Sequence, residues 1–125
     1  MQNHKNQGFR AAFKNAFLGF HYALSTEKNL KRHFAAGILA ITAGLVLQIS
    51  LMEWCIILLT INTVIVAELL NTALEYTVDI ASPEKREMAR RAKDVSAAAV
   101  LVTASCSVLV GLLIFLPKIL PLIGF

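Results

Sequence analysis

Long apolar runs separated by short polar segments dominate the chain and predict membrane-crossing helices. Residues 34–52 form about 19 nearly unbroken apolar positions, residues 54–67 begin a second run, and residues 95–116 form a third run without any charge. Because a helix needs about 20 mostly apolar residues to cross a bilayer, we expect three spans, at about 32–52, 54–81 and 94–116. The later part of the second span carries polar residues and should extend beyond the hydrocarbon into water.

The segment at about 8–26 has the pattern of an amphipathic helix that lies on the membrane surface. Phe9, Phe13 and Phe17 recur at helical spacing, with basic residues such as Arg10 between them. Such a helix can be a plain anchor without chemistry, or it can border a site at the interface. The pattern predicts where the helix lies and leaves its role open.

Composition favours a membrane protein over an ordinary soluble domain. The 125 residues are 57% hydrophobic and 16% charged, and the mean hydropathy is +0.65. The formal charge of +4 comes mainly from basic residues in two short blocks, 5–32 and 85–93. We interpret these blocks as cytoplasmic membrane flanks and not as a nucleic-acid surface, since each borders an apolar run. The N-terminus should then lie inside the cell and the C-terminus outside.

Four polar side chains share one face of the second predicted span. At 100° per residue, Glu68, Asn71, Glu75 and Asp79 fall within an arc of roughly 80°, over a rise of about 16 Å. Carboxylates inside a span are costly unless they are paired, protonated or hydrated, so an intramembrane acid is a functional candidate. Glu68, the deepest, suits a general base, whereas Glu75 and Asp79 suit a metal or a charged cosubstrate.

This polar stripe also fits two other interpretations. It can be a seam that specifies helix association, with Asn71 and the carboxylates bound to Lys93 or Arg90. An intramembrane acid also suits a proton-coupled transporter subunit, although residues 54–67 offer no second acidic step. The pattern alone is compatible with a helix-association seam and disfavours a transporter subunit.

Other charged and titratable residues have ordinary interpretations on pattern alone. Glu27 precedes several basic residues and is typical of a solvated interfacial charge. Lys93 and Asp94 open the third span either as a helix-end charge pair or as part of a close helix contact. No P-loop or Rossmann glycine pattern is present, so a nucleotide would have to bind through a metal, carboxylates and basic residues. Three scattered histidines, without a pair four residues apart, are expected to be inert: His4, His21 and His33.

Three segments together resemble the family of small prokaryotic diacylglycerol kinases and undecaprenol kinases: ELLNTALEYTVD at 68–79, ARRAKDVSAAAVL at 89–101 and TEKN at 26–29. The resemblance implies an all-α membrane protein, a homotrimer of three-span subunits with shared active sites and an N-terminal surface helix. It further implies that residues 1–125 form one lipid kinase domain in the inner (plasma) membrane. This domain would transfer the γ-phosphate of ATP to a lipid hydroxyl on the cytoplasmic side.

Carried over position by position, the resemblance implies roles for individual residues. Glu68 would be the base for the lipid hydroxyl, and Glu27 and Glu75 would bind Mg²⁺. Glu68 and Ala97 would contact the lipid substrate. The positions expected around ATP are Asn71, Asp79, Glu84, Lys85, Arg86, Lys93 and Asp94.

A finer resemblance concerns the identity of the lipid. The runs TEKNLKRHFAAG at 26–37 and GLLIFLPK at 111–118 look like the undecaprenol kinase branch, so undecaprenol is favoured over diacylglycerol. The physical chemistry of the chain does not separate the two lipids, because each presents a hydroxyl on an apolar chain at the interface. In the surface helix, Arg10 and Asn15 do not reproduce the pattern of Gram-negative diacylglycerol kinases, and no role is assigned to them.

Overall fold

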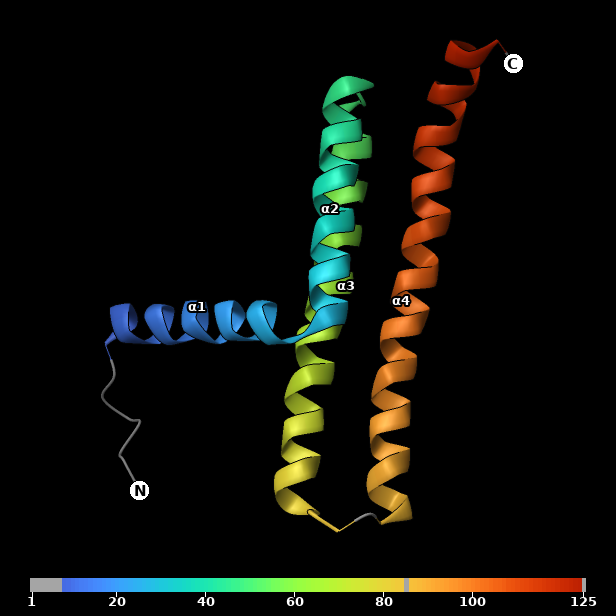
Figure 1. The fold of residues 1–125 in the computed structure, drawn as a ribbon. Coiled ribbons are helices and arrows are strands. Elements are labelled where there is room, and N and C mark those ends of the chain that lie inside the picture. The colour runs from blue at the N-terminus through green and yellow to red at the C-terminus, as the bar shows by residue number, and fades with distance from the viewer. Residues whose placement is uncertain (1–7, 85, 125) are drawn as a thin grey trace.

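The computed structural model describes residues 8–84 and 86–124, and every regular element in this part of the chain is helical. The predicted all-α class is therefore confirmed. Figure 1 shows α2, α3 and α4 alongside one another and α1 projecting sideways from this bundle. α3 and α4 pack together most extensively. In chain order the elements are α1 Phe9–Thr26, α2 Lys28–Val46, α3 Leu51–Ala81, α4 Glu87–Ile119 and the short 3-10 helix η2 Leu120–Ile123.

The connection between α2 and α3 corrects two predicted boundaries. α2 ends at Val46 and not near 52, because Gln48 adopts a positive φ of 50° and Ser50 is already the N-cap of α3. The Ser50 hydroxyl accepts a hydrogen bond from the Glu53 N–H at 3.3 Å, and the Glu53 carboxylate accepts one from the Ser50 N–H at 2.7 Å. Glu53, which lies between the first two predicted spans, therefore belongs to the first turn of α3 in a capping box.

α4 is longer than the predicted span at both ends. It starts at Glu87 and not near 94, because ion pairs between residues four apart support its charged first turns. Glu87 pairs with Arg91 at 2.6 Å, and Arg90 pairs with Asp94 at 3.1 Å. Pro117, the first residue after the predicted span, lies inside the helix. Proline lacks a backbone N–H, and its position in the last turn of α4 limits the loss to one hydrogen bond near the helix end. The α-helix continues for two residues beyond Pro117, and η2 follows.

The solvent-accessible surface is too large for a compact soluble protein. It measures 9732 Å². A folded soluble monomer of 13.7 kDa would expose about 6,600 Å². Much of the excess is apolar, since side chains such as Phe9, Leu39 and Leu113 are 87%, 70% and 77% exposed. A surface of this kind needs lipid or another chain to cover it.

Two described helices are long and apolar enough to cross a membrane, namely α3, and α4 together with η2. α2 is less apolar over its full length, because its first turns carry Lys28, Lys31, Arg32 and His33. Length and composition therefore support two spans directly, and α2 adds a shorter apolar segment beside them.

α2 packs against α3 along a seam of buried residues that recur every seven positions. These residues are Leu30, Gly37 and Gly44. A Cβ atom added at Gly37 would lie 3.1 Å from the Ile61 side chain, and one added at Gly44 would lie 2.8 Å from the α3 tryptophan ring. The two glycines thus allow the helices to approach closely. This seam places His33, between Leu30 and Gly37, on the side of α2 that faces α3.

Candidate active site

The polar stripe predicted on α3 lies on one face of that helix, and its members differ in burial. Glu68 is buried, with 3% of its surface exposed, whereas Asn71 and Glu75 are half-buried and Asp79 is exposed. Asn71 Nδ2 donates a hydrogen bond to Glu75 Oε1 at 3.2 Å, as residues four apart on a helix can do. The predicted common face is confirmed, and the stripe runs from a buried carboxylate to an exposed one.

The buried Glu68 carboxylate meets His33 of α2. His33 Nε2 lies 3.1 Å from Glu68 Oε1, and the two side chains are 28% and 4% exposed. The ring is not aligned for a hydrogen bond, since Glu68 Oε1 accepts none from the described residues. This contact gives His33 a polar partner, which the expectation of an inert residue did not include. The expectation rested on the lack of a histidine pair within one helix, whereas the partner of His33 comes from another helix.

Glu27 lies at the corner between α1 and α2 and faces α3. Its backbone is the C-cap of α1 and the N-cap of α2. Its Oε1 accepts a hydrogen bond from the Tyr76 hydroxyl at 2.8 Å, and the Tyr76 ring packs edge-on against Tyr22 of α1. Half-buried and hydrogen-bonded, Glu27 is not the freely solvated charge that pattern alone favours.

The residues predicted to bind Mg²⁺, Glu27 and Glu75, supply one carboxylate from the α1–α2 corner and one from α3. Mg²⁺ in phosphoryl-transfer sites is usually held by one or two carboxylates together with substrate phosphates, not by a complete protein cage. Among the described residues, no three His, Cys, Asp or Glu side chains are arranged to hold a metal alone. Asn71 Oδ1, however, is buried without a hydrogen-bond partner and is a free hard oxygen. Binding of Mg²⁺ by Glu27 and Glu75 stays a prediction with which this donor set is consistent.

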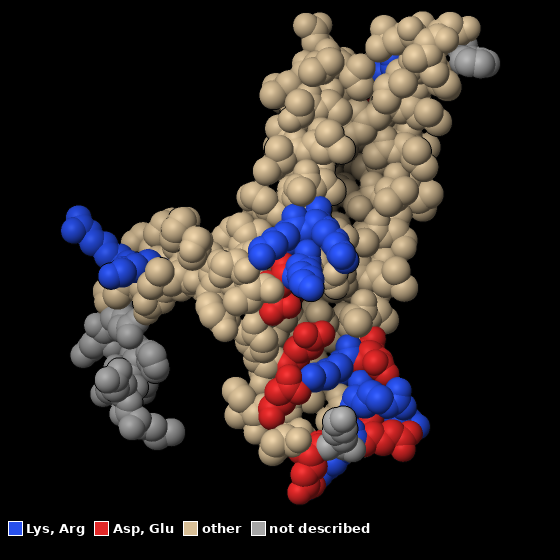
Figure 2. All heavy atoms as spheres, viewed as in Figure 1, with Lys and Arg blue, Asp and Glu red and all other residues tan. Residues whose placement is uncertain are grey.

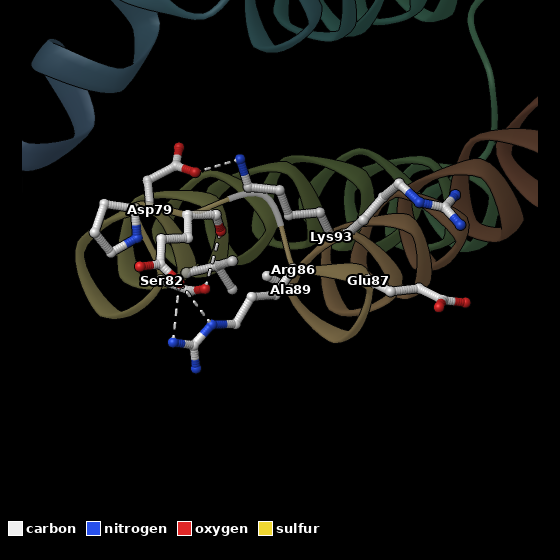
Figure 3. Close-up of a pocket in the computed structure, with 10 residues that line it drawn as sticks. Asp79, Ser82, Arg86, Glu87, Ala89 and Lys93 are labelled. Carbon is white, nitrogen blue, oxygen red and sulfur yellow. Dashed lines mark hydrogen bonds and ion pairs between the residues drawn. The ribbon is translucent and has the colours of Figure 1, made fainter.

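A pocket of about 590 Å³ lies where α3 ends and α4 begins (Figure 3). The Lys93 side chain reaches from α4 to pair with Asp79 of α3, Nζ to Oδ1 at 2.5 Å. In the connection, Arg86 pairs with the Glu84 carboxylate at 3.1 Å. The pocket therefore offers charged groups of both signs from two helices. Its lining residues are Val78, Asp79, Ser82, Pro83, Glu84, Arg86, Glu87, Ala89, Arg90 and Lys93.

The pocket gathers four of the residues predicted around ATP: Asp79, Glu84, Arg86 and Lys93. Asn71 is hydrogen-bonded to Glu75 farther along α3, and Asp94 pairs with Arg90 along α4, so neither lines the pocket. Lys85 lies outside the described residues. Ser82 and Arg90 also line the pocket and were not predicted. The charge-rich run that opens α4 is the signal that could have indicated Arg90.

Charged side chains gather in one half of the molecule, as Figure 2 shows. They surround the α3–α4 connection and the start of α2, whereas the half with the α2–α3 connection is almost uncharged on the face shown. At that uncharged end, Glu53 pairs with Lys118 at 3.2 Å. Ala97, expected at the lipid, is exposed on α4 one turn beyond Lys93. The candidate site thus lies at the border between the charged and apolar halves.

The sequence of the chain is similar to those of known kinases. The profile of the prokaryotic diacylglycerol kinase family matches residues 14–115. Undecaprenol kinase from Bacillus subtilis (strain 168) is 40% identical over 120 residues, which cover 94% of this chain and 98% of that protein. Diacylglycerol kinase from Synechocystis sp. is 38% identical over 112 residues, covering 89% of this chain and 64% of that protein. Diacylglycerol kinase from Escherichia coli (strain K12) is 29% identical over 105 residues, covering 82% and 86%.

Proposed function

The chain belongs to the prokaryotic diacylglycerol kinase family, and from this premise we propose that it transfers the γ-phosphoryl group of ATP to undecaprenol, giving undecaprenyl phosphate. The observation that carries the choice of lipid is the similarity to the Bacillus undecaprenol kinase, which extends over 98% of that protein. The alternative is phosphorylation of diacylglycerol to phosphatidic acid, supported by the 38% identity to the Synechocystis enzyme. With either lipid, the chain is a lipid kinase.

Glu68 is the proposed general base. The lipid hydroxyl oxygen would bond to the γ-phosphorus, and its proton would move to a carboxylate oxygen of Glu68. The bond from the γ-phosphorus to the bridging oxygen would break, and ADP would leave. The burial of Glu68 supports this role, because a carboxylate that is shielded from water binds a proton more readily than an exposed one.

The nucleotide is proposed to lie along the stripe, from the carboxylate corner to the pocket at the start of α4. Phosphoryl transfer needs mainly positioning and neutralisation of phosphate charge, which Lys93, Arg86 and Arg90 can supply without a dedicated nucleotide fold. Mg²⁺ held by Glu27 and Glu75 would neutralise further charge on the phosphates. The other residues assigned to the nucleotide are Asn71, Asp79, Glu84, Lys85 and Asp94, and Ala97 is assigned to the lipid.

The proposed membrane arrangement has α2 as a third span beside α3 and α4. The basic residues that open α2 and α4 support a cytoplasmic location for the site, with the N-terminus inside and the C-terminus outside the plasma membrane. The exposed aromatic residues of α1 support its placement in the cytoplasmic interface. The uncovered apolar surface and family membership support a homotrimer, in which neighbouring subunits would share active sites.

A proton-coupled transporter subunit and a non-enzymatic assembly module are not favoured. In the half of α3 beyond Glu68, the hydroxyls of Thr60 and Thr63 donate to carbonyl oxygens of their own helix. Those groups offer no titratable step between Glu68 and the far end of α3. An assembly module predicts that Glu68→Gln leaves function intact and changes only the oligomer size.

Purified protein in mixed micelles, supplied with Mg²⁺ and radiolabelled ATP, tests the proposal when undecaprenol, diacylglycerol and ceramide are offered separately. We expect label in undecaprenyl phosphate, a strong loss in Glu68→Gln, and a raised Mg²⁺ requirement in Glu75→Gln. Absence of label from every lipid would sink the kinase assignment. If only diacylglycerol became labelled, the assignment as a lipid kinase would stand, and diacylglycerol would replace undecaprenol as the proposed substrate.

A further inference from the structure

His33 occupies a position in the α2–α3 seam that would ordinarily hold an apolar residue. Its neighbours on this face of α2, Leu30 and Gly37, are both buried, and Leu30 is 0% exposed. The Gly37 backbone packs within reach of the Ile61 side chain, so the two helices are close together one turn from His33. The imidazole is therefore held by the packing of its helix at the depth of the Glu68 carboxylate, with Nε2 at 3.1 Å from Oε1.

Glu68 differs from the other acids of the site in the partners it has. Glu75 accepts a hydrogen bond from Asn71, and Glu27 accepts one from Tyr76. Among the described residues, His33 supplies the polar contact of Glu68, and this contact lacks hydrogen-bond alignment. Catalytic hydrogen bonds are often poorly aligned before substrate binds and become well aligned only in the complex.

We propose that His33 is a positioning residue for Glu68, a role that rests on Glu68 being the base of the proposed kinase reaction. The imidazole holds Oε1 on the α2 side of the carboxylate. The other carboxylate oxygen is then turned toward the incoming lipid hydroxyl before the lipid arrives. Fixing a base in its reactive orientation lowers the barrier, and a misplacement of about 1 Å can cost roughly 100-fold in rate. His33 itself neither bonds to the phosphate nor takes part in the phosphoryl transfer.

A packing role is the competing explanation, because a polar contact between two membrane helices can simply stabilise their association. The two explanations differ in what a glutamine does at this position. Glutamine carries an amide N–H donor that can replace the Nε2 of histidine, whereas leucine fills the seam without any donor. If His33 only packs, kcat should fall in proportion to the loss of thermal stability in each variant. If His33 positions Glu68, kcat should fall in the leucine variant, which lacks an N–H donor, and be retained in the glutamine variant, which has one.

The test compares His33→Leu, His33→Gln and the control His21→Leu, which removes an exposed histidine of α1 away from the seam. The substrate is the better acceptor found in the lipid panel, and thermal stability is measured for each variant. For His33→Leu we expect kcat to fall about 10- to 100-fold, with the KM for ATP within about twofold of wild type. His33→Gln should recover most of the lost kcat, and His21→Leu should match wild type.

A wild-type kcat in His33→Leu would overturn the proposal. Equal decreases of kcat in His33→Leu and His33→Gln, in proportion to their decreases in thermal stability, would also overturn it. The double variant of His33→Leu and Glu68→Gln should be no slower than Glu68→Gln alone, and a further loss would also contradict the proposal. An inactive Glu68→Gln with a fully active His33→Leu would refute the positioning role and leave the kinase assignment standing. A fully active Glu68→Gln would refute the base assignment and the positioning role together.

Discussion

Replacing Glu68 with glutamine should make the protein more stable and much less active. In the folded chain the Glu68 side chain is 4% exposed, and its Oε1 accepts no hydrogen bond from the described residues. A buried polar atom without a partner costs about 1–3 kcal/mol, and a buried charge costs more unless it is well paired. Glutamine has nearly the same shape, carries no charge, and can donate its amide N–H toward His33. We therefore expect the free energy of unfolding to rise by about 1–2 kcal/mol.

The same change should remove the proton acceptor from the proposed reaction. Loss of a general base lowers rates by about 100- to 10,000-fold. At 1.36 kcal/mol per factor of ten, this corresponds to about 3–5 kcal/mol added to the barrier. Stability and activity should therefore change in opposite directions, a combination expected where a costly group is kept for function.

Reversible unfolding in detergent micelles and kinase turnover would be measured on the same preparations. Glu75→Gln is the matched control for stability, because Glu75 is half-buried and its Oε1 already accepts a hydrogen bond from Asn71. Its free energy of unfolding should stay within about 0.5 kcal/mol of wild type. A Glu68→Gln protein that is less stable than wild type, or one that keeps its turnover, would refute the reasoning.

Four further substitutions test the nucleotide pocket, the cap of α3 and the packing of the helices. Lys93→Met should raise the KM for ATP about tenfold or more in steady-state assays, because it removes a cation from the pocket. It should change the free energy of unfolding by less than about 1 kcal/mol, since its pair with Asp79 is partly exposed. Ser50→Ala should lower the unfolding free energy by about 1 kcal/mol in the same micelle assay, through loss of the α3 cap. Gly44→Ala should lower the free energy of unfolding by about 1–2 kcal/mol, because the added Cβ would overpack the α2–α3 seam. Gly111→Ala is the matched control: its Cβ would enter open space, and the free energy of unfolding should rise by up to about 1 kcal/mol.

The sequence alone predicted the features that depend on local periodicity. The all-α class, the common face of the acidic stripe and the end of α3 at Ala81 all follow from helical spacing and from turn residues such as Ser82 and Pro83. The pairing of Asp79 with Lys93 also has a local basis, because a short connection brings the end of α3 beside the start of α4. Features of this kind need no knowledge of how distant segments are aligned.

The contact between His33 and Glu68 could not be predicted in the same way. It depends on the register of α2 against α3, which is fixed by Gly37 and Gly44 and the side chains that they allow to approach. No spacing within either helix indicates that register. The partial burial of Glu27 depends likewise on the corner between α1 and α2. The proposed role of Glu27 as a metal ligand follows from family resemblance alone.

The helix ends were predicted least well, and for reasons that concern single residues. Glu53 is charged and falls between two predicted spans, whereas its position three residues after Ser50 makes it part of a cap. Pro117 directly follows the third predicted span, but α4 continues through it to Ile119. In both cases the residue type suggested that a helix is interrupted there, whereas the position of the residue within the helix end allows the helix to include it.

Competition between the two lipids in a single vesicle preparation shows whether undecaprenol or diacylglycerol is the preferred substrate. Undecaprenol and diacylglycerol would be present at equal mole fraction with purified protein, Mg²⁺ and labelled ATP, and the labelled products would be separated and counted. We expect undecaprenyl phosphate to carry most of the label, with kcat/KM for undecaprenol about tenfold or more above that for diacylglycerol, which corresponds to about 1.4 kcal/mol. A majority of the label in phosphatidic acid would contradict it.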